Sequence, residues 1–313
     1  MTIPSVDYIW QDGKLVAWEQ AQVHVLTHAL HYGSGAFEGL RCYATPQGPA
    51  IFRLRDHMQR FLNSARLLFM ELPWSLDELC EAVRATVAAN KLEQCYIRPL
   101  VFRGYGSMGV DPLEAPVQCI IAVWPWDSYL GEEALASGVD VGISSWRQRS
   151  PNAFPPQVKA TASYLNSGLA HVEAVRHGYH EAILLSEAGK VCEGSGENLF
   201  IVHDGALITP PISDGVLAGI TRDSVMELAR DSGMQVREES LVRSQLYLAQ
   251  ECFMSGTAAE VVPVRSCDGI KIGTGKAGPI ALGLQKAYFA CVHGEDAQHL
   301  DWLAFVEGVS HGV

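Results

Sequence analysis

Lys159 is the residue whose type and setting most favour covalent chemistry. It lies in the uncharged, small-residue stretch Gln157-Val-Lys-Ala-Thr-Ala-Ser-Tyr-Leu-Asn166, and it is the only lysine between Lys91 and Lys190. A lysine that is desolvated by such surroundings has a lowered pKa, which frees its amine as a nucleophile toward an aldehyde. Because most lysines lie on the surface, a plain surface lysine is the alternative.

A second candidate is Glu193, at the start of Glu193-Gly-Ser-Gly-Glu-Asn-Leu-Phe200. The two glycines permit a tight turn between a preceding strand and the apolar residues 199–202. An acid entering such a turn could face a cavity and pair with a cation. A solvated hairpin turn is the alternative, since Gly/Ser/Asn clusters are common in turns.

Two further segments could hold an anion. In Leu217-Ala-Gly-Ile-Thr-Arg-Asp-Ser224, we expect Thr221 to cap a helix and Gly219 to let the backbone approach a ligand. The free N–H groups of a helix start can cradle a phosphate. In Met254-Ser-Gly-Thr-Ala-Ala-Glu260, a strand ends in small residues whose N–H groups and hydroxyl could serve an anion. An ordinary capped helix and a plain turn are the respective alternatives.

Two other patterns favour no such chemistry. Gly104-Tyr-Gly-Ser-Met-Gly109 fits GxGxxG, but prolines at 112 and 116 break the segment after it, where a dinucleotide site needs a helix. His24, His28 and His31 have spacings that could bind a metal on a helix. No further ligand cluster is near them, so we expect a structural or pocket-lining role and no metal site.

The elements expected to position these residues alternate between strands and helices, which is typical of a mixed α/β protein. Apolar spacing predicts a helix over Arg53–Phe69, and the capping box of Ser75 and Glu78 predicts another to about Asn90. Helices are also expected at Leu165–Arg176 and Thr221–Asp231. Strands are expected at Tyr8–Trp10, Lys14–Ala17, Gln22–Val25, Tyr96–Phe102, Val117–Trp124, Glu181–Ser186, Leu199–His203 and Glu251–Met254, with a new strand pattern from Val139.

Composition limits the remaining classes of protein. With 48% hydrophobic and 19% charged residues, the 313-residue chain can bury a large core. The net charge is −12 and no Lys/Arg-rich run occurs, so we expect no nucleic-acid partner. No stretch of about 18 apolar residues is present, so we expect no membrane span. The eight cysteines lack CxxC spacing, which favours reduced thiols in the cytoplasm.

Taken in order, these motifs resemble the bacterial-type branched-chain amino acid aminotransferases, in the fold-type IV class of pyridoxal-phosphate (PLP) enzymes. The resemblance extends to the N-terminal part through His28-Ala-Leu-His-Tyr-Gly33, Phe37-Glu-Gly-Leu-Arg41 and Tyr96-Ile-Arg-Pro99. It implies two domains: a small N-terminal α/β domain over residues 1–130 and a larger C-terminal, PLP-binding domain with a barrel-like β core over 138–313. A linker over 131–137 would join them, and PLP would lie in the cleft between the domains.

The resemblance also implies a role for each cofactor residue. Lys159 would form the Schiff base with PLP and then shuttle the proton. Glu193 would pair with the pyridine nitrogen, and Tyr164 would hydrogen-bond the 3′ oxygen. The remaining cofactor-binding residues, chiefly for the phosphate, would be Arg60, Leu217, Gly219, Ile220, Thr221, Gly256 and Thr257.

The substrates implied are small: leucine, isoleucine and valine with 2-oxoglutarate, which yield branched-chain 2-oxo acids and L-glutamate in a ping-pong cycle. Arg98 would receive the side-chain carboxylate of glutamate, and Tyr96 with the backbone of 257–258 the α-carboxylate. The substrate site as a whole would contain Phe37, Gly39, Tyr96, Arg98, Met108, Val110, Tyr129, Thr257 and Ala258. The alternative for Phe37 and Tyr129 is plain core packing.

The resemblance further implies a homodimer or a higher homo-oligomer built from dimers, in which a loop from the neighbour completes each site. Gly104–Val110 is the candidate loop, with Arg103 and Tyr105 where the family leads us to expect less bulky or acidic residues. Rival functions on the same scaffold are a D-amino-acid or amine aminotransferase and aminodeoxychorismate lyase. A PLP-binding protein without turnover and a nicotinamide dehydrogenase are the rivals from other classes.

Overall fold

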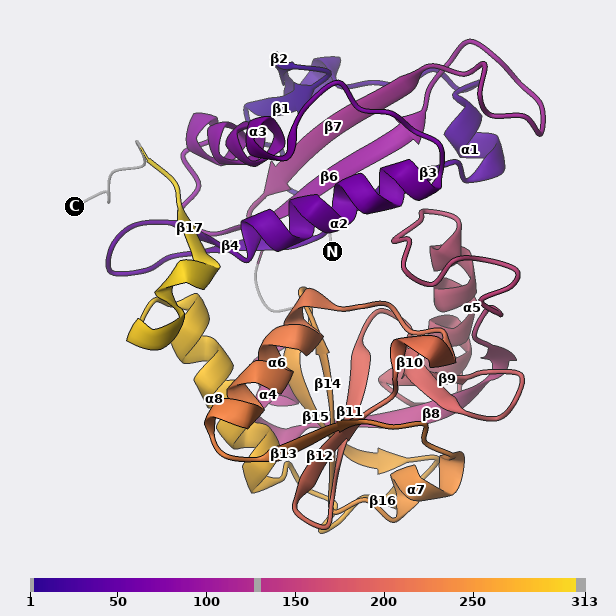
Figure 1. The fold of residues 1–313 in the computed structure, drawn as a ribbon, viewed down its shortest axis with the longest axis vertical. Helices are drawn as coiled ribbons and strands as arrows, with labels where there is room; N and C mark the ends of the chain where they lie inside the picture. The colour runs from indigo at the N-terminus through magenta and orange to yellow at the C-terminus, as the bar shows by residue number, and fades with distance from the viewer. Residues whose placement is uncertain (1–2, 127–130, 308–313) are drawn as a thin grey trace. The chain divides into compact units, whose positions relative to one another are not determined.

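The computed structural model describes residues 3–126 and 131–307. Contacts divide the chain into two compact units, each with its own sheet (Figure 1). The first unit takes in residues 1–127, 158–162 and 290–313. The second takes in 128–157 and 163–289. In the part of the chain that the structure describes, every helix is too short or too polar to cross a bilayer.

The first unit is built on an antiparallel sheet in the order β17-β5-β4-β6-β7-β1-β2, with β3 paired to β6. The long central strands β6 and β7 pair from Tyr96↔Trp124 to Arg103↔Val117. The strands are β1 Tyr8–Gln11, β2 Lys14–Ala17, β3 Gly35–Phe37, β4 Leu40–Tyr43, β5 Ala50–Phe52, β6 Cys95–Arg103, β7 Val117–Trp124 and β17 Leu303–Phe305.

Two long helices pack on this sheet, α2 Leu54–Leu67 and α3 Leu76–Ala89 (Figure 1). Helix α2 buries Leu54, Met58 and Phe61 along one face, as the apolar spacing predicts. Helix α3 begins at the predicted capping box, in which Ser75 and Glu78 each accept from the other's backbone N–H. Short elements of the same unit are η1 Trp18–Gln20, α1 His28–Tyr32 and η3 Ala297–Trp302.

The second unit holds a nine-stranded mixed sheet in the order β10-β9-β8-β15-β14-β11-β12-β13, with β16 paired to β15. Its parallel pairs are β8–β9, β8–β15 and β12–β13. The strands are β8 Val139–Arg147, β9 Glu181–Leu185, β10 Val191–Gly194, β11 Asn198–His203, β12 Ala206–Thr209, β13 Gln235–Glu238, β14 Glu251–Gly256, β15 Glu260–Cys267 and β16 Ile270–Lys271.

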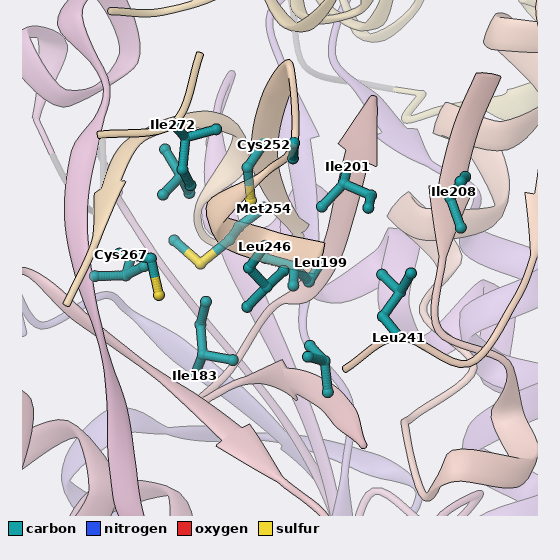
Figure 2. Close-up of a cluster of buried hydrophobic side chains, with 14 of the residues drawn as sticks. Ile183, Leu199, Ile201, Ile208, Leu241, Leu246, Cys252, Met254, Cys267 and Ile272 are labelled. Carbon is teal, nitrogen blue, oxygen red and sulfur yellow. The ribbon is translucent and has the colours of Figure 1, made fainter. Parts of the chain in front are cut away.

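This second sheet curls around a common apolar interior. Figure 2 shows side chains from widely separated strands converging there, among them Ile183, Leu199, Met254 and Cys267. Leu246 comes from a helix and joins the same cluster. The barrel-like β core implied by the resemblance is therefore confirmed. The helices of the second unit are α4 Glu132–Ser137, α5 Ser163–Arg176, η2 Ile212–Asp214, α6 Ile220–Asp231, α7 Arg243–Tyr247 and α8 Pro279–Val292, the last of which runs into the first unit.

The contacts group two segments differently from the expected domain ranges. Residues 158–162 join the first unit because Ala160 pairs with Ala36 beside β3. Residues 290–313 join it because β17 pairs with β5. Both pairings connect residues far apart in sequence, so no local composition change marks them. The assignment of residues 138–313 to one PLP-binding domain stays a prediction.

The predicted helices and most predicted strands are confirmed within two residues of their ends. The strand predicted over Gln22–Val25 is wrong: this segment is irregular, turns at Val25–Leu26 and exposes Val23 and Val25. A segment with an alternating pattern forms a strand only where a neighbouring strand can hydrogen-bond to its backbone. Among the described residues, no strand pairs with this segment. The linker expected over residues 131–137 forms α4, Glu132–Ser137.

Candidate active site

Lys159 lies in a short extended segment that the first unit holds by its backbone. Its N–H donates to the Ser64 hydroxyl of α2 (3.3 Å), and its carbonyl accepts from the Phe37 N–H of β3 (2.9 Å). Thr161 N–H donates to the Gly35 carbonyl (2.9 Å), which extends the pairing. The half-buried side chain places its amine 5.1 Å from the centre of the Phe37 ring. Lys159 is therefore fixed at one sheet edge, facing an aromatic side chain.

Arg98 contacts the same Phe37 ring as Lys159 and lies in a cage of aromatic rings. Its guanidinium carbon is 4.6 Å from the ring centre of Phe37, 5.1 Å from that of Tyr96 and 5.7 Å from that of Trp124. Arg98 Nη2 donates to the Tyr96 hydroxyl (3.3 Å), while Arg98 Nε is buried without a hydrogen-bond partner among the described residues. The aromatic rings thus surround a cation that has an unused N–H donor, and this makes Arg98 suitable for binding a carboxylate.

Gly39 completes this group of predicted residues. A Cβ at position 39 would lie 2.0 Å from the Tyr96 hydroxyl, so only glycine allows that hydroxyl to approach the backbone here. Phe37 is 9% exposed and Tyr96 is 5% exposed. The structure thus brings together Lys159, Phe37, Gly39, Tyr96 and Arg98 within the first unit.

Arg60 of α2 is the predicted phosphate residue of the same unit. Its Nε and Nη2 donate to the two carboxylate oxygens of Glu38, at 2.6 and 2.9 Å. Glu38 is fully buried and also accepts from His57 Nδ1 (2.8 Å). The sequence analysis missed Glu38 and His57, although Glu38 stands inside the quoted motif between Phe37 and Gly39.

In the second unit, Glu193 is the next-to-last residue of β10, and its carboxylate accepts from Gln148, Leu217 and Asn198. Gln148 Nε2 donates to Oε1 (2.5 Å), while the Leu217 N–H (3.0 Å) and Asn198 Nδ2 (3.4 Å) donate to Oε2. Gln148 is 6% exposed and also donates to the Gly215 carbonyl (2.9 Å). Gln148 and Asn198 were missed, because only the fold shows that they contact Glu193.

The predicted anion cradle at residues 217–221 is a helix start, but its cap differs from the prediction. Helix α6 begins at Ile220, so Gly219 is the N-cap and Thr221 is the second helical residue, 3% exposed. A Cβ at position 219 would lie 1.9 Å from Asn198 Oδ1, which excludes any larger residue. Thr221 as N-cap is therefore wrong, since this close approach requires glycine at the cap. The first N–H groups of α6 have no partner within the helix, as expected for an anion cradle.

The turn between β14 and β15 lies beside the Glu193 turn. Strands β14 and β15 pair to Gly256↔Glu260 and leave Thr257, Ala258 and Ala259 as the turn. A Cβ at position 256 would be 3.3 Å from the Gly196 carbonyl and 3.6 Å from Glu197 Cγ. Ser255 Oγ is buried there with no hydrogen-bond partner among the described residues. The second unit therefore gathers Glu193, Leu217, Gly219, Ile220, Thr221, Gly256 and Thr257, with Ala258 in the same turn.

Four predicted site residues lie apart from these groups or outside the described residues. Met108 is 47% exposed and Val110 is 91% exposed on the loop after β6. Tyr129 falls outside the described residues. Tyr164 lies in the first turn of α5 and is half-buried. Arg103, which precedes the candidate loop, is buried and donates to the Ala115 carbonyl (2.9 Å) at the loop's end.

The two distracting patterns have structural explanations. His28 is buried, with its ring nitrogens at 2.7 Å from Ser34 Oγ and 2.9 Å from the Gly109 carbonyl, so it pins the loop after β6. His31 Nε2 lies 2.9 Å from the Val25 carbonyl. The segment after Gly109 is irregular up to β7, so the GxGxxG match lacks the helix that a dinucleotide site requires.

Comparison with known proteins decides the family. The model for "Amino-transferase class IV" matches residues 35–267. The chain belongs to the class IV aminotransferases. It is 50% identical to the branched-chain-amino-acid aminotransferase of Salmonella typhimurium over 97% of this chain and 98% of that protein. The resemblance drawn from the motifs is thereby confirmed.

Solved structures of class IV aminotransferases agree in fold. The crystal structure of the Escherichia coli branched-chain amino acid aminotransferase has a TM-score of 0.94 at 49% identity, covering 97% of this chain and 100% of the other. The T.th. branched-chain amino acid aminotransferase with pyridoxamine 5′-phosphate also has a TM-score of 0.94, at 47% identity, covering 97% and 99%. The expected fold-type IV architecture is confirmed.

Proposed function

We propose that this aminotransferase uses PLP to move an amino group between branched-chain L-amino acids and 2-oxoglutarate, in a ping-pong cycle. Leucine, isoleucine and valine would give their 2-oxo acids, and 2-oxoglutarate would give L-glutamate. The observation that carries this proposal is that the amine of Lys159 and the caged guanidinium of Arg98 both contact the ring of Phe37. The relatives named above as branched-chain-amino-acid aminotransferases support the choice of substrates.

The residues present fit PLP by their chemistry. Lys159 offers an amine for the aldehyde, and Glu193 offers a carboxylate, held by Gln148 and Leu217, for a protonated ring nitrogen. The start of α6 at Ile220 and Thr221 offers N–H donors for a phosphate, and the unpartnered Ser255 hydroxyl lies beside the neighbouring turn. When bound, PLP supplies the electron sink for the bond broken at Cα.

The work of the chain's own residues follows from these positions. Lys159 would hold the cofactor through its aldehyde carbon until the substrate amine takes its place, and the lysine amine would then carry a proton between the substrate Cα and the cofactor's C4′. Glu193 would keep the ring nitrogen protonated, Tyr164 would donate to the 3′ oxygen, and Arg60, Thr257 and the start of α6 would bind the phosphate. Lys159 is therefore the one catalytic residue in this proposal.

Substrate binding divides between apolar and polar groups. Phe37, Met108, Val110 and Tyr129 would form an apolar wall. One methylene in such a pocket is worth about 1–3 kcal/mol, so the three branched-chain substrates would be poorly separated. Arg98 would bind the side-chain carboxylate of glutamate through its spare donors. Tyr96 and the turn at Thr257–Ala258 would bind the α-carboxylate. Gly39 has no side chain and therefore leaves room for the Tyr96 hydroxyl.

The test combines a spectrum with an assay. The purified protein should absorb visible light through bound PLP and should form glutamate from L-leucine and 2-oxoglutarate. Lys159→Ala should lose both the absorbance of the lysine-linked cofactor and the turnover. Normal turnover by Lys159→Ala would reject the mechanism. A preference for D-amino acids or amines in the same assay would replace the proposed substrates by those of a rival enzyme on this scaffold.

We also infer a homo-oligomer, at least a dimer, from an apolar patch on the first unit. The ring centres of His24 and Tyr105 lie 4.3 Å apart, and His28 contacts Gly109, so α1 and the loop after β6 lie together. The apolar patch is defined by four exposed side chains of these segments: Val25 (73%), Leu30 (64%), Tyr105 (56%) and Val110 (91%). Contiguous apolar surface of this kind often marks a protein interface.

A cytoplasmic location is inferred from the thiols. All eight cysteines are buried thiols, which suits a reducing compartment. Burial raises the pKa of Cys192 and of Cys267 to about 12, so these thiols carry no nucleophilic thiolate at neutral pH.

A further inference from the structure

We propose that Glu38 is a positioning residue, which locks the guanidinium of Arg60 in the orientation that receives the cofactor's phosphate, with His57 as the third member of the group. This inference rests on the proposed function, because it assumes that the phosphate belongs to PLP. It assigns a role to Glu38 and His57, two buried side chains that have no role in the proposed function.

The geometry fixes Arg60 on one edge of its guanidinium. Nε and Nη2 donate to Oε1 and Oε2 of Glu38, so each carboxylate oxygen receives one bond in a bidentate pair. Such a pair holds the guanidinium plane in register with the carboxylate plane. The opposite edge, which carries Nη1 and the second hydrogen of Nη2, is thereby turned away from Glu38. This edge is the one a phosphate oxygen could meet.

The carboxylate is itself held from two elements. Glu38 follows β3, and its N–H donates to the Pro99 carbonyl of β6 (2.9 Å). His57 and Arg60 are three residues apart on α2, so they share a helix face and reach the same carboxylate. Glu38 is 0% exposed and His57 is 1% exposed, while the Arg60 side chain retains 12% exposure. Within this group of three residues, the Arg60 side chain is thus the most exposed.

Electrostatics keeps this group in one charge state near neutral pH. Burial alone would raise the pKa of Glu38, but the charge of Arg60 and hydrogen bonds from His57 and Arg60 hold it well below its usual range. Burial lowers the pKa of His57, and the charges of Arg60 and Lys159 lower it further against the opposing effect of Glu38. Both lowered pKa values are consistent with a neutral His57 that donates from Nδ1 to an ionised Glu38.

A purely structural role is the competing explanation. A buried ion pair often contributes little net stability, because desolvation of both charges offsets their attraction. The two roles differ in what they predict for the ligand. An orienting role concerns the phosphate alone, whereas a structural role would change binding of any cofactor form.

The experiment compares PLP with pyridoxal, which has the same ring and aldehyde but no phosphate. Apo protein of the wild type and of Glu38→Gln is titrated with each, and the dissociation constants are read from absorbance. Loss of a charge-assisted hydrogen bond to a buried cation typically weakens binding by about tenfold or more. We expect Glu38→Gln to lose about that factor for PLP and to bind pyridoxal as the wild type does.

Equal losses for PLP and pyridoxal, or no loss for either, would overturn the inference. Glu81→Gln is the matched control, because Glu81 forms an exposed i,i+3 pair with Arg84 and should leave both constants unchanged. If Glu38→Gln fails to fold, His57→Gln takes its place. It should likewise lower the ratio of the affinity for PLP to the affinity for pyridoxal. In an Arg60→Ala background, Glu38→Gln should no longer change the ratio.

The outcome separates this inference from the proposed function. Suppose that the wild type binds PLP and transaminates, and that Glu38→Gln keeps the wild-type ratio of PLP affinity to pyridoxal affinity. That result rejects only the role of Glu38. A wild type that binds no PLP rejects the proposed function as well.

Discussion

Glu197 is a carboxylic acid buried inside the turn that carries Glu193. It is 6% exposed, its carboxylate accepts from the Gly196 N–H (3.1 Å), and its carbonyl accepts from the Gly194 N–H (2.7 Å). Burial, together with repulsion from Glu181, raises the pKa of Glu197 from 4.5 to about 8. Glu197 is therefore largely neutral at pH 7 and holds the turn without adding a second charge near Glu193.

Glu197→Gln should flatten the pH dependence of stability between about pH 4.5 and pH 8. The folded protein keeps this proton up to about pH 8, whereas the unfolded chain loses it near 4.5. The contribution of Glu197 to the free energy of unfolding is thus complete below pH 4.5 and falls by about 1.4 kcal/mol per pH unit as the pH rises toward 8. Glutamine has no proton to lose, so urea denaturation of the variant across this range should lack that slope.

Glu187→Gln provides the control, because Glu187 is an exposed acid in the turn after β9. It should follow the wild-type pH dependence. If Glu197→Gln shows the wild-type slope as well, Glu197 is ionised in the folded protein and the neutral state inferred here is incorrect.

At the residue scale, the sequence could predict the candidates whose signal is local. Lys159 and Glu193 stand out by residue type within a short stretch of unusual composition. Gln148 and Glu38 do not stand out, because their roles depend on contacts with Glu193, 45 residues away, and Arg60, 22 residues away. A glutamine in an irregular segment and a glutamate beside a strand have many ordinary explanations. Only the fold shows which partner each one meets.

At the scale of elements, helix starts show the same limit. The capping box of α3 is complete within Ser75–Glu78, so the sequence predicted it correctly. The start of α6 depends on Asn198 of β11, which approaches Gly219 and makes glycine the cap in place of Thr221. Strand prediction likewise failed at Gln22–Val25, where the pattern was suitable but no partner strand was at hand among the described residues.

Gly219→Ala should weaken PLP binding by disturbing the start of α6. The added Cβ would lie 1.9 Å from Asn198 Oδ1, so Asn198 must move. Asn198 Nδ2 donates to the Leu217 carbonyl (2.9 Å) and to Glu193, so its movement would displace both the cradle and the carboxylate. We expect about a tenfold loss in PLP affinity, as for a lost charge-assisted hydrogen bond, measured by titration of the apo protein.

Gly283→Ala is the matched substitution for this test. Gly283 lies within α8, and a Cβ there would meet no atom within 4 Å, so PLP affinity should stay at the wild-type value. Unchanged affinity in Gly219→Ala would mean that Asn198 can move aside without disturbing the candidate cofactor residues.

At the scale of the whole molecule, the candidate cofactor residues are drawn from both units. Lys159 and Arg60 belong to the first, whereas Tyr164, Glu193, Thr221 and Thr257 belong to the second. Through the family resemblance, the sequence predicted the mixed α/β fold and its barrel-like β core. It did not predict that the lysine segment and the C-terminal residues join the first unit, since their strand partners β3 and β5 lie more than a hundred residues earlier in the chain.

Self-association is the property of the whole molecule that the apolar patch allows us to test. Leu30→Glu places a charge at the 64% exposed position of the patch on α1. If this surface is buried between two copies, the unpaired charge must be desolvated on association, which costs several kcal/mol and disfavours the oligomer strongly. Sedimentation velocity should then show a wild-type oligomer and a Leu30→Glu species of about half that mass or less.

Leu248→Glu, at a 74% exposed position outside the patch, should sediment as the wild type does. The net charge of −12 adds repulsion between copies that salt screens, so the wild-type oligomer should tighten as ionic strength rises. A monomeric wild type, or a Leu30→Glu variant that keeps the wild-type mass, would show that this patch is not the contact between copies.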